Sequence, residues 1–318
     1  MDPDYDALDS SLFGRRRKHP SEPWGMHREM WLARSGDADA RSRGQDGGVV
    51  TALLAWMLEI EEIEAACVSK PSSTKPWFDE PFLAKNKQDL LEAAGSRYTY
   101  CSTPLALKMA AEAKMKHVAM VGVSCESTAI REMAAEGIKR WSRMVKFIAG
   151  LMCNETFAYE PFINEIVSGR YGIDLARVVK VNVKGDVFVT LDDDSEILIP
   201  LDECKPYANE WCHQCPDFAA EHADISFGGL GMNGWTMCVI RTEFGQDVWS
   251  RAVAAGVIET RAASEEPNAL KVLDALAKKQ RRRVDPFDSH AAGRWPIKEV
   301  INRVRREFID DFHSSQET

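Results

Sequence analysis

Residues 117–153 have the sequence HVAMVGVSCESTAIREMAAEGIKRWSRMVKFIAGLMC, in which two apolar runs flank an amphipathic segment. The runs at 117–123 and 144–151 have the length of strands and are apolar throughout, so we expect both to be buried on two faces. The segment 126–136 between them has helical spacing and ends before Gly137. The order strand, helix, strand predicts a parallel α/β unit.

The rest of the chain adds helices and an antiparallel part to this unit. The apolar pattern predicts helices near 49–58, 85–94, 105–115, 159–168, 268–279 and 297–312, and a strand at 65–69. Runs at 178–183 and 187–191 flank Lys184-Gly185-Asp186 and predict a hairpin, followed by a candidate third strand at 197–201. Strands at 224–227 and 237–241 flank a glycine-rich loop. We therefore expect a mixed α/β fold with an antiparallel hairpin region and a helical C-terminal tail.

The composition is that of an ordinary globular protein of 318 residues, with 45% hydrophobic and 28% charged residues. No apolar run approaches the roughly 20 residues that span a bilayer, and no apolar core of a secretory signal follows the N-terminus. We therefore expect a cytoplasmic protein. The net charge of −9 argues against a general nucleic-acid binder.

We divide the chain into an arm, a body and a tail. Residues 1–34 are rich in Pro, Gly and charge and predict a poorly structured arm. Residues 35–260 form the body, with an N-terminal part at 35–116 and a C-terminal part at 117–260. Residues 261–318 form the tail, in which we interpret the basic run 278–283 as a solvated helix end, with partner docking as the alternative.

The motif Cys212-His213-Gln214-Cys215-Pro216 is the most specific local signal. In a cytoplasmic chain the eight cysteines are not expected to form disulfides. Two thiolates at this spacing can bind one metal ion or one face of a cluster, and proline after the second cysteine is common at iron–sulfur sites. Half of a zinc site or a redox dithiol has the same spacing.

Two further cysteines follow the two buried strands. Cys125 and Cys153 come just after the runs at 117–123 and 144–151, so parallel strands would place both thiols at the same carboxyl edge of the sheet. With Cys212 and Cys215 they would supply the four thiolates that a 4Fe–4S cluster needs. The alternative is that Cys125 and Cys153 are small buried hydrophobic side chains.

The remaining cysteines and a second role of Cys125 stay open. Gly122-Val123-Ser124-Cys125-Glu126 resembles a strand–turn–helix elbow that would expose a nucleophilic thiol, although the last glycine of that pattern is missing. Cys204 could replace one ligand. Cys67, Cys101 and Cys238 lie in or beside strand-like segments and are expected to pack.

Glycine-rich turns mark two candidate anion sites. Arg43-Gly44-Gln45-Asp46-Gly47-Gly48 leads directly into the helix that begins near Val49, so free N–H groups could face a phosphate. Gly95-Ser96-Arg97-Tyr98 offers a guanidinium and hydroxyls to such a group. A flexible helix entry and a helix C-cap are the respective alternatives.

A third glycine loop has the spacing of a dinucleotide-binding motif. Gly229-Leu230-Gly231-Met232-Asn233-Gly234 matches G-x-G-x-x-G, but the segment after it predicts a strand instead of the helix that this motif requires. The loop could still approach a flat ligand closely, since glycine has no side chain. Arg241 adds a cation beside the end of the following strand.

Several of these segments together resemble the beta-subunit family of coenzyme F420-reducing hydrogenases and F420-linked dehydrogenases. The matching pieces, in family order over roughly residues 40–256, are GQDGGVVTALL, GSRYTY, VGVSCE, GLMCNETF, CHQCPDFAAEHADISFG and GWTMCVIRTEFG. The family often has proline where this chain has Ser124, and this chain lacks the additional ferredoxin-type cysteine runs of some members.

The resemblance implies a flavin and iron–sulfur oxidoreductase subunit. Family members bind FAD and a 4Fe–4S cluster and exchange hydride with F420, a deazaflavin that carries only hydride. FAD and the cluster then pass electrons singly to a catalytic partner of the hydrogenase, formate dehydrogenase or heterodisulfide reductase type. Cys125, Cys153, Cys212 and Cys215 fall on the family's cysteine positions. The implied FAD contacts are Gly44, Gln45, Asp46, Gly47, Gly48, Thr51, Ser96, Arg97, Tyr98, Gly228, Gly229, Gly231 and Arg241.

Three other functions compete with this one. The first is a ferredoxin-linked flavin reductase with the same cofactors and another substrate. The second is a hydrolase or amidotransferase that depends on Cys125. The third is an assembly module that zinc stabilises without catalysis.

Overall fold

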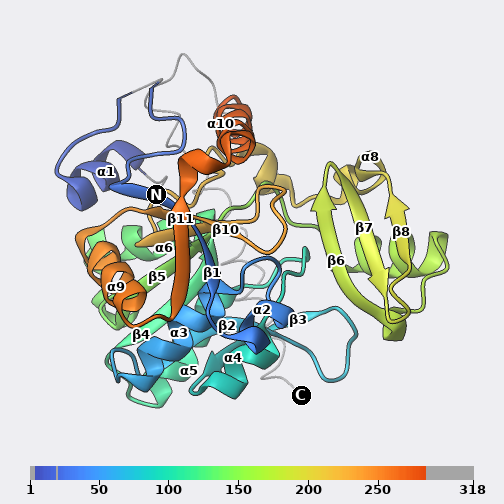
Figure 1. Ribbon diagram of the computed structural model, residues 1–318, viewed down its shortest axis with the longest axis horizontal. Helices are drawn as coiled ribbons and strands as arrows, with labels where there is room; N and C mark the ends of the chain where they lie inside the picture. Colours follow the sequence, from blue (N-terminus) through green and yellow to red (C-terminus); the bar gives the residue numbers. More distant parts are fainter. Residues whose placement is uncertain (1–3, 19–20, 284–318) are drawn as a thin grey trace, which may run out of the picture.

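The two apolar runs form neighbouring parallel strands inside a mixed sheet. The structure, a computed structural model, describes residues 4–18 and 21–283. β4 (Val118–Val123) pairs in parallel with β5 (Val145–Leu151), and α6 (Ser124–Ala135) and α7 (Lys139–Ser142) connect them (Figure 1). The predicted α/β unit is therefore confirmed.

The large sheet has eight strands in the order β11-β1-β10-β9-β5-β4-β2-β3. The four consecutive strands β9, β5, β4 and β2 are parallel to one another, while the pairs toward both edges are antiparallel. The other strands of this sheet are β1 (Glu29–Ser35), β2 (Ala65–Pro71), β3 (Asp79–Ala84), β9 (Ile225–Gly228), β10 (Thr236–Ile240) and β11 (Ile258–Ala262).

Helices cover both faces of the central strands, which explains the uninterrupted apolar runs. On one face Ala119 and Phe147 pack with α3 (Val49–Glu59), α4 (Lys87–Ala93) and α9 (Glu243–Ala254). On the other face Met120 and Ile148 pack with α5 (Ala106–Glu112) and α6. Successive residues thus alternate between two cores, and neither face is left to solvent.

The predicted hairpin belongs to a separate three-stranded antiparallel sheet beside the large one (Figure 1). It consists of β6 (Val178–Lys184), β7 (Asp186–Leu191) and β8 (Glu196–Ile199). Val187 and Val189 of β7 are buried against η2 (Glu160–Arg170), a π-helix where the sequence predicts a helix at 159–168. The remaining elements are α1 (Tyr5–Phe13), α2 (Ala38–Arg43), α8 (Leu201–Cys204), α10 (Pro267–Arg281), η1 (Thr103–Leu105), η3 (Leu175–Arg177), η4 (Lys205–Tyr207), η5 (Glu210–Gln214) and η6 (Ala263–Glu265).

The expectation of a poorly structured arm over residues 1–34 is wrong for the part that the structure describes. α1 is a helix capped by Asp4, and β1 lies inside the large sheet between β10 and β11. The partners of β1 come from residues 236–262, about 200 residues later in the chain, so local composition could not indicate this pairing. The apolar pattern does not predict β3, α2 or β11 either.

The expected tail is confirmed in part. α10 occupies the segment for which the sequence predicts a helix at 268–279, whereas the helix predicted at 297–312 lies outside the described residues. No helix within residues 4–18 and 21–283 is long and apolar enough to cross a membrane.

A buried ion network fastens the N-terminal segment to the body. The Arg17 guanidinium pairs with Asp9 (Nε–Oδ2 2.6 Å) and with Glu221, and all three side chains are about 1% exposed. Asp9 also contacts His222 Nε2 at 3.2 Å, and Arg281 of α10 reaches Glu221 from the other side. The N-terminal segment, the segment around Glu221 and α10 are therefore joined by one buried network of charged side chains.

We predict that Arg17→Met lowers the free energy of unfolding by about 3 kcal/mol, because it removes the cation that two buried carboxylates share and leaves Asp9 with only His222 and Glu221 with only Arg281. Arg16→Met is the matched control, since Arg16 is exposed and contacts Asp6 only at 3.6 Å. Urea unfolding of both variants measures the difference. Equal stability of the two variants would show that the network carries no net stabilisation.

Candidate functional site

The carboxyl edge of the parallel strands positions two cysteines. In the β4–β5 ladder Val123 lies opposite Leu151, so both strands end at the same level. Cys125 is the second residue of α6, which follows β4 directly, and Cys153 comes two residues after β5. The placement expected from the sequence is confirmed, because parallel strands direct their following loops to one edge of the sheet.

The C-x-x-C motif folds against the loop that carries Cys153. Cys212 lies in η5 and Cys215 just after it. The N–H of Cys153 donates to Phe218 O at 2.9 Å, and the Thr156 hydroxyl lies 3.8 Å from Cys212 Sγ. The segment after β5 and the 212–218 segment are thereby held side by side.

The electrostatics of the thiols show that the four cysteines lie close together. Burial raises the pKa of Cys125 well above its usual value, and Glu126 and the other three thiols raise it further. Burial raises the pKa of Cys153 in the same way, with Cys212 and Cys215 as the next causes. The charges of these thiols therefore reach one another, and a positive charge near them would stabilise their thiolates.

The spacing of these thiols does not match a single metal ion. Within residues 4–18 and 21–283, no group of three or more His, Cys, Asp or Glu side chains is placed to hold one ion. A single zinc would draw all four sulfurs to about 2.3 Å from one centre. A 4Fe–4S cluster would instead place each cysteine on a different iron.

The other cysteines lie elsewhere. Cys204 is buried in the core of the small sheet, and burial, Glu203 and Arg170 account for its pKa of about 11. Cys67 and Cys238 are fully buried in the large sheet, as expected for packing residues. Cys101 is half-buried near Asp79 and Glu126.

A nucleophilic role of Cys125 finds no support in its surroundings. A reactive cysteine needs a lowered pKa, supplied by a helix N-terminus, a cation or a base. Although Cys125 lies in the first turn of α6, burial and neighbouring thiols raise its pKa well above the usual value. A raised pKa of this kind is typical of an unreactive buried thiol and disfavours a free nucleophile.

The first glycine loop is closely packed at the start of α3. Gly48 has φ +69° and precedes the helix, and a side chain there would collide with the Ala40 carbonyl of α2. The N–H of Gly47 donates to Thr236 Oγ1 at 3.1 Å. Among the described residues, no side chain caps the first turn of α3, so its N–H groups stay available to an anion.

The three predicted loops meet. Gln45 Oε1 accepts a hydrogen bond from Ser96 N at 3.4 Å, which joins the first two loops. A side chain at Gly229 would collide with the carboxylate of Asp46, so the third loop lies directly against the first. A side chain at Gly228 would likewise collide with Met152, next to Cys153.

Tyr98 links the glycine loops to the cysteines. Burial raises the pKa of its hydroxyl to about 12, and the charges of Asp46 and Cys153 raise it as well, which places both groups near this ring. The hydroxyl accepts a hydrogen bond from Val183 N of β6 at 3.3 Å. Gly44, Gln45, Asp46, Gly47, Gly48, Ser96, Tyr98, Gly228 and Gly229 thus form one contiguous region next to the thiols, and Gly231 follows in the same loop.

Two lysines of β6 belong to this region, although no motif in the sequence marks them. Lys180 Nζ donates to Gln45 O at 2.8 Å, and Lys184 Nζ donates to Asn233 Oδ1 at 3.0 Å. Burial raises the pKa of Asp46, and Lys184 and Lys180 lower it. The one available signal is the alternation of β6, which places Lys180, Asn182 and Lys184 on one face.

Arg241 and Arg97, both expected to contact a cofactor, have structural roles instead. Arg241 is 1% exposed and donates four hydrogen bonds, to Ser226 Oγ and to the carbonyls of Trp24, Met26 and Ala219. Arg97 pairs with Asp79 and donates to the carbonyls of Ala93 and Ala94 at the end of α4. Both guanidiniums are occupied by protein groups that local sequence cannot reveal.

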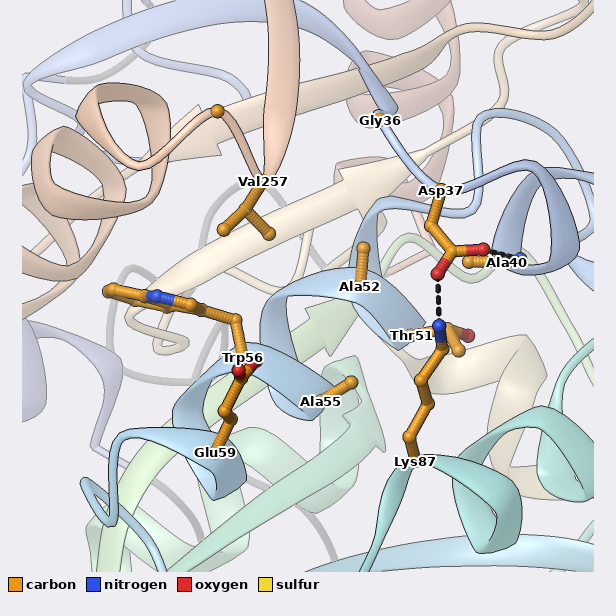
Figure 2. Close-up of a pocket in the computed structure, with 11 residues that line it drawn as sticks. Gly36, Asp37, Ala40, Thr51, Ala52, Ala55, Trp56, Glu59, Lys87 and Val257 are labelled. Atoms are coloured by element: carbon orange, nitrogen blue, oxygen red, sulfur yellow. Dashed lines mark hydrogen bonds and ion pairs between the residues drawn. The ribbon is translucent and has the colours of Figure 1, made fainter.

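Thr51, an implied FAD contact, lines a cavity beside α3. Figure 2 shows this cavity of about 220 Å³, with Thr51, Trp56 and the ion pair between Asp37 and Lys87 in its lining. Ala40 and Val257 complete part of the wall. Thr51 therefore faces the groove between α2, α3 and α4 in the described part of the chain.

Comparisons with known proteins agree with this architecture. Two family models described as coenzyme F420 hydrogenase/dehydrogenase beta subunit match the chain. The model of the N-terminal part of that subunit matches residues 30–108, and the model of its C-terminal part matches residues 115–266. Together the matches include β1 and β11, which lie outside the motifs recognised in the sequence.

Individual relatives cover most of the chain. The coenzyme F420 hydrogenase subunit beta of Methanothermobacter thermautotrophicus is 32% identical over 266 residues, which cover 82% of this chain and 94% of the relative. The F420-dependent formate dehydrogenase 1 subunit beta of Methanococcus maripaludis is 24% identical, covering 74% of this chain and 62% of the relative.

A solved structure confirms the fold. A chain of the F420-reducing NiFe hydrogenase complex from Methanosarcina barkeri superposes with a TM-score of 0.79 at 32% identity, covering 84% of this chain and 92% of that chain. These relatives are named as parts of hydrogenases and dehydrogenases. The matched models and the extent of these similarities show that this chain belongs to the coenzyme F420 hydrogenase/dehydrogenase beta-subunit family, a family of oxidoreductase subunits.

Proposed function

We propose that this chain is the F420-reacting subunit of a larger redox complex, with FAD on the glycine loops and a 4Fe–4S cluster on Cys125, Cys153, Cys212 and Cys215. The observation that carries the proposal is the nearness of the four thiols to the three joined loops, since Met152 contacts Gly228 and the charges of Asp46 and Cys153 both act on Tyr98. Together the two groups would convert the electron pair of a hydride into single electrons for a partner.

The donor set supports the cluster. Four thiols converge from three segments, and all eight cysteines of the chain are free of disulfides. Burial raises the pKa of Cys215 to about 12, so its thiolate depends on a nearby cation such as cluster iron. A soft sulfur donor set of this kind favours iron–sulfur clusters over hard cations.

The loops support a flavin nucleotide. The uncapped N-terminus of α3 and the lysines of β6 supply partial and full positive charge on either side of Asp46. A pyrophosphate or the anionic tail of the deazaflavin would find hydrogen-bond donors there. Gly44, Gly47 and Gly48 pack against backbone atoms of α2 and β1, which fixes the shape of this corner.

The partner is proposed from the relatives. The similar proteins are named as subunits of a hydrogenase and of a formate dehydrogenase, so the same kind of subunit serves different catalytic partners. We expect this chain to occur in such a complex. The cytoplasmic location expected from the sequence stays a prediction.

The proposal is tested on protein purified anaerobically with whatever partners accompany it. We expect one FAD and four irons with four sulfides per chain, and reduction of the flavin absorbance on mixing with reduced F420. Absence of both FAD and iron would contradict the proposal. Presence of both without a reaction with F420 would favour the ferredoxin-linked reductase.

Ligand variants test the cluster separately. We predict that Cys212→Ser and Cys153→Ser lose most iron and sulfide, because each removes one of the four thiolates. Cys101→Ser is the control, since this half-buried thiol lies outside the four. Iron and sulfide analysis measures the effect, and iron retained in both ligand variants would contradict the assignment.

Lysine variants test the anion site. We predict that Lys180→Gln weakens binding of FAD or F420 about tenfold, because one charge-assisted hydrogen bond is worth about 1.5 kcal/mol or more. Lys146→Gln is the control, since Lys146 pairs with Glu62 near the amino end of β5, at the opposite edge of the sheet from the cysteines. The FAD content and the KM for F420 distinguish the two ligands. If both stay unchanged in Lys180→Gln, the lysine does not contribute to the site.

A further inference from the structure

The C-terminal end of α10 contacts both loops that carry the cysteines. Arg283, just after the helix, donates from Nη1 to Asn154 O at 2.8 Å and to Cys212 O at 2.7 Å. Its Nη2 donates to Asn154 Oδ1 at 3.2 Å. One guanidinium therefore ties the loop after β5 to the C-x-x-C segment. The interpretation of the basic run 278–283 as a solvated helix end is wrong for this residue.

Gln280, in the last turn of α10, makes a second link between the two cysteine-bearing segments. Its side chain is 1% exposed, and Nε2 donates to Asp217 O at 3.0 Å and Cys153 O at 3.3 Å. Oε1 of Gln280 has no hydrogen-bond partner among the described residues, an unusual cost for a buried amide.

The positive charge of Arg283 has only a distant carboxylate as its ion-pair partner. Its nearest carboxylate, on Glu155, lies 3.6 Å away, and both side chains are largely buried. A cation and an amide donor beside an iron–sulfur cluster stabilise the more negative, reduced form, since reduction adds one electron. An apolar contact could hold the loops together equally well, but it could not act on the cluster's charge.

We propose that Gln280 and Arg283 are positioning residues that hold the two cysteine-bearing loops around the cluster and set its reduction potential. The inference rests on the proposed function, since it requires the cluster. It assigns the end of α10 a role in electron transfer that packing of the tail alone would not provide.

The test compares Arg283→Gln and Gln280→Leu with Arg282→Gln in the anaerobically purified, cluster-containing protein. Arg282 is the matched control because it is the adjacent arginine and is exposed. For Arg283→Gln we expect the equilibrium constant for one-electron reduction to fall about tenfold, which corresponds to about 59 mV toward more negative potential. For Gln280→Leu we expect a smaller change in the same direction, and for Arg282→Gln none.

Cluster stability gives a second readout. We expect iron release to a chelator to be several-fold faster in Arg283→Gln and Gln280→Leu than in Arg282→Gln. Arg283→Lys keeps the charge but loses the forked contact, so its potential should stay near that of the wild type while its iron is released faster. If Arg283→Gln does not fold, Arg283→Lys and Gln280→Leu still carry the test.

The outcomes separate the two proposals. A wild-type protein without iron and sulfide would overturn the proposed function and this inference with it. A wild-type protein with an intact cluster, whose potential and iron release are the same in Arg283→Gln and Gln280→Leu as in Arg282→Gln, would overturn this inference alone.

Discussion

The site depends on the parallel pairing of β4 and β5. Both strands are covered by helices on two faces, so their register is fixed by two apolar cores at once. Because the strands run in the same direction and end at the same level, the chain leaves both at one edge of the sheet. The thiols of Cys125 and Cys153 therefore lie at the same edge, although they are far apart in the sequence. Everything else in the site is built against this edge.

The remaining parts are brought to that edge by hydrogen bonds between distant loops. Gln45 connects the first glycine loop to Ser96 and, through its carbonyl, to Lys180 of the small sheet. The charges of Asp46 and Cys153 both raise the pKa of the Tyr98 hydroxyl. The small sheet thus forms part of the wall around the glycine loops. A flavin held by these loops would lie next to the cysteines, as single-electron transfer between two cofactors requires.

Buried charged side chains also stabilise contacts between distant segments of the chain. Arg17 and Arg241 are both almost fully buried, and each connects segments that are about 200 residues apart. Such groups stabilise one arrangement of the chain because every alternative leaves a charge or a carbonyl unpaired in the interior. Both contact the segment that follows the C-x-x-C motif, Arg17 through Glu221 and Arg241 through the carbonyl of Ala219. The same principle applies at the end of α10, where Arg283 contacts the cysteine loops themselves.

The sequence by itself determined the mixed α/β class, the hairpin and the family, because these depend on local periodicity and on motifs of fixed spacing, whereas the role of the four cysteines stays a prediction. The tertiary structure alone decided the roles of the charged residues. Arg241 and Arg97, expected at a cofactor, bind backbone carbonyls and Asp79, while Lys180 and Lys184 lie at the glycine loops although no motif marks them. The pairing of β1 could not be predicted from the sequence for the same reason, since its partners lie some 200 residues away. The role of a charged side chain or of a strand edge depends on what lies opposite it, and only the folded chain specifies that partner.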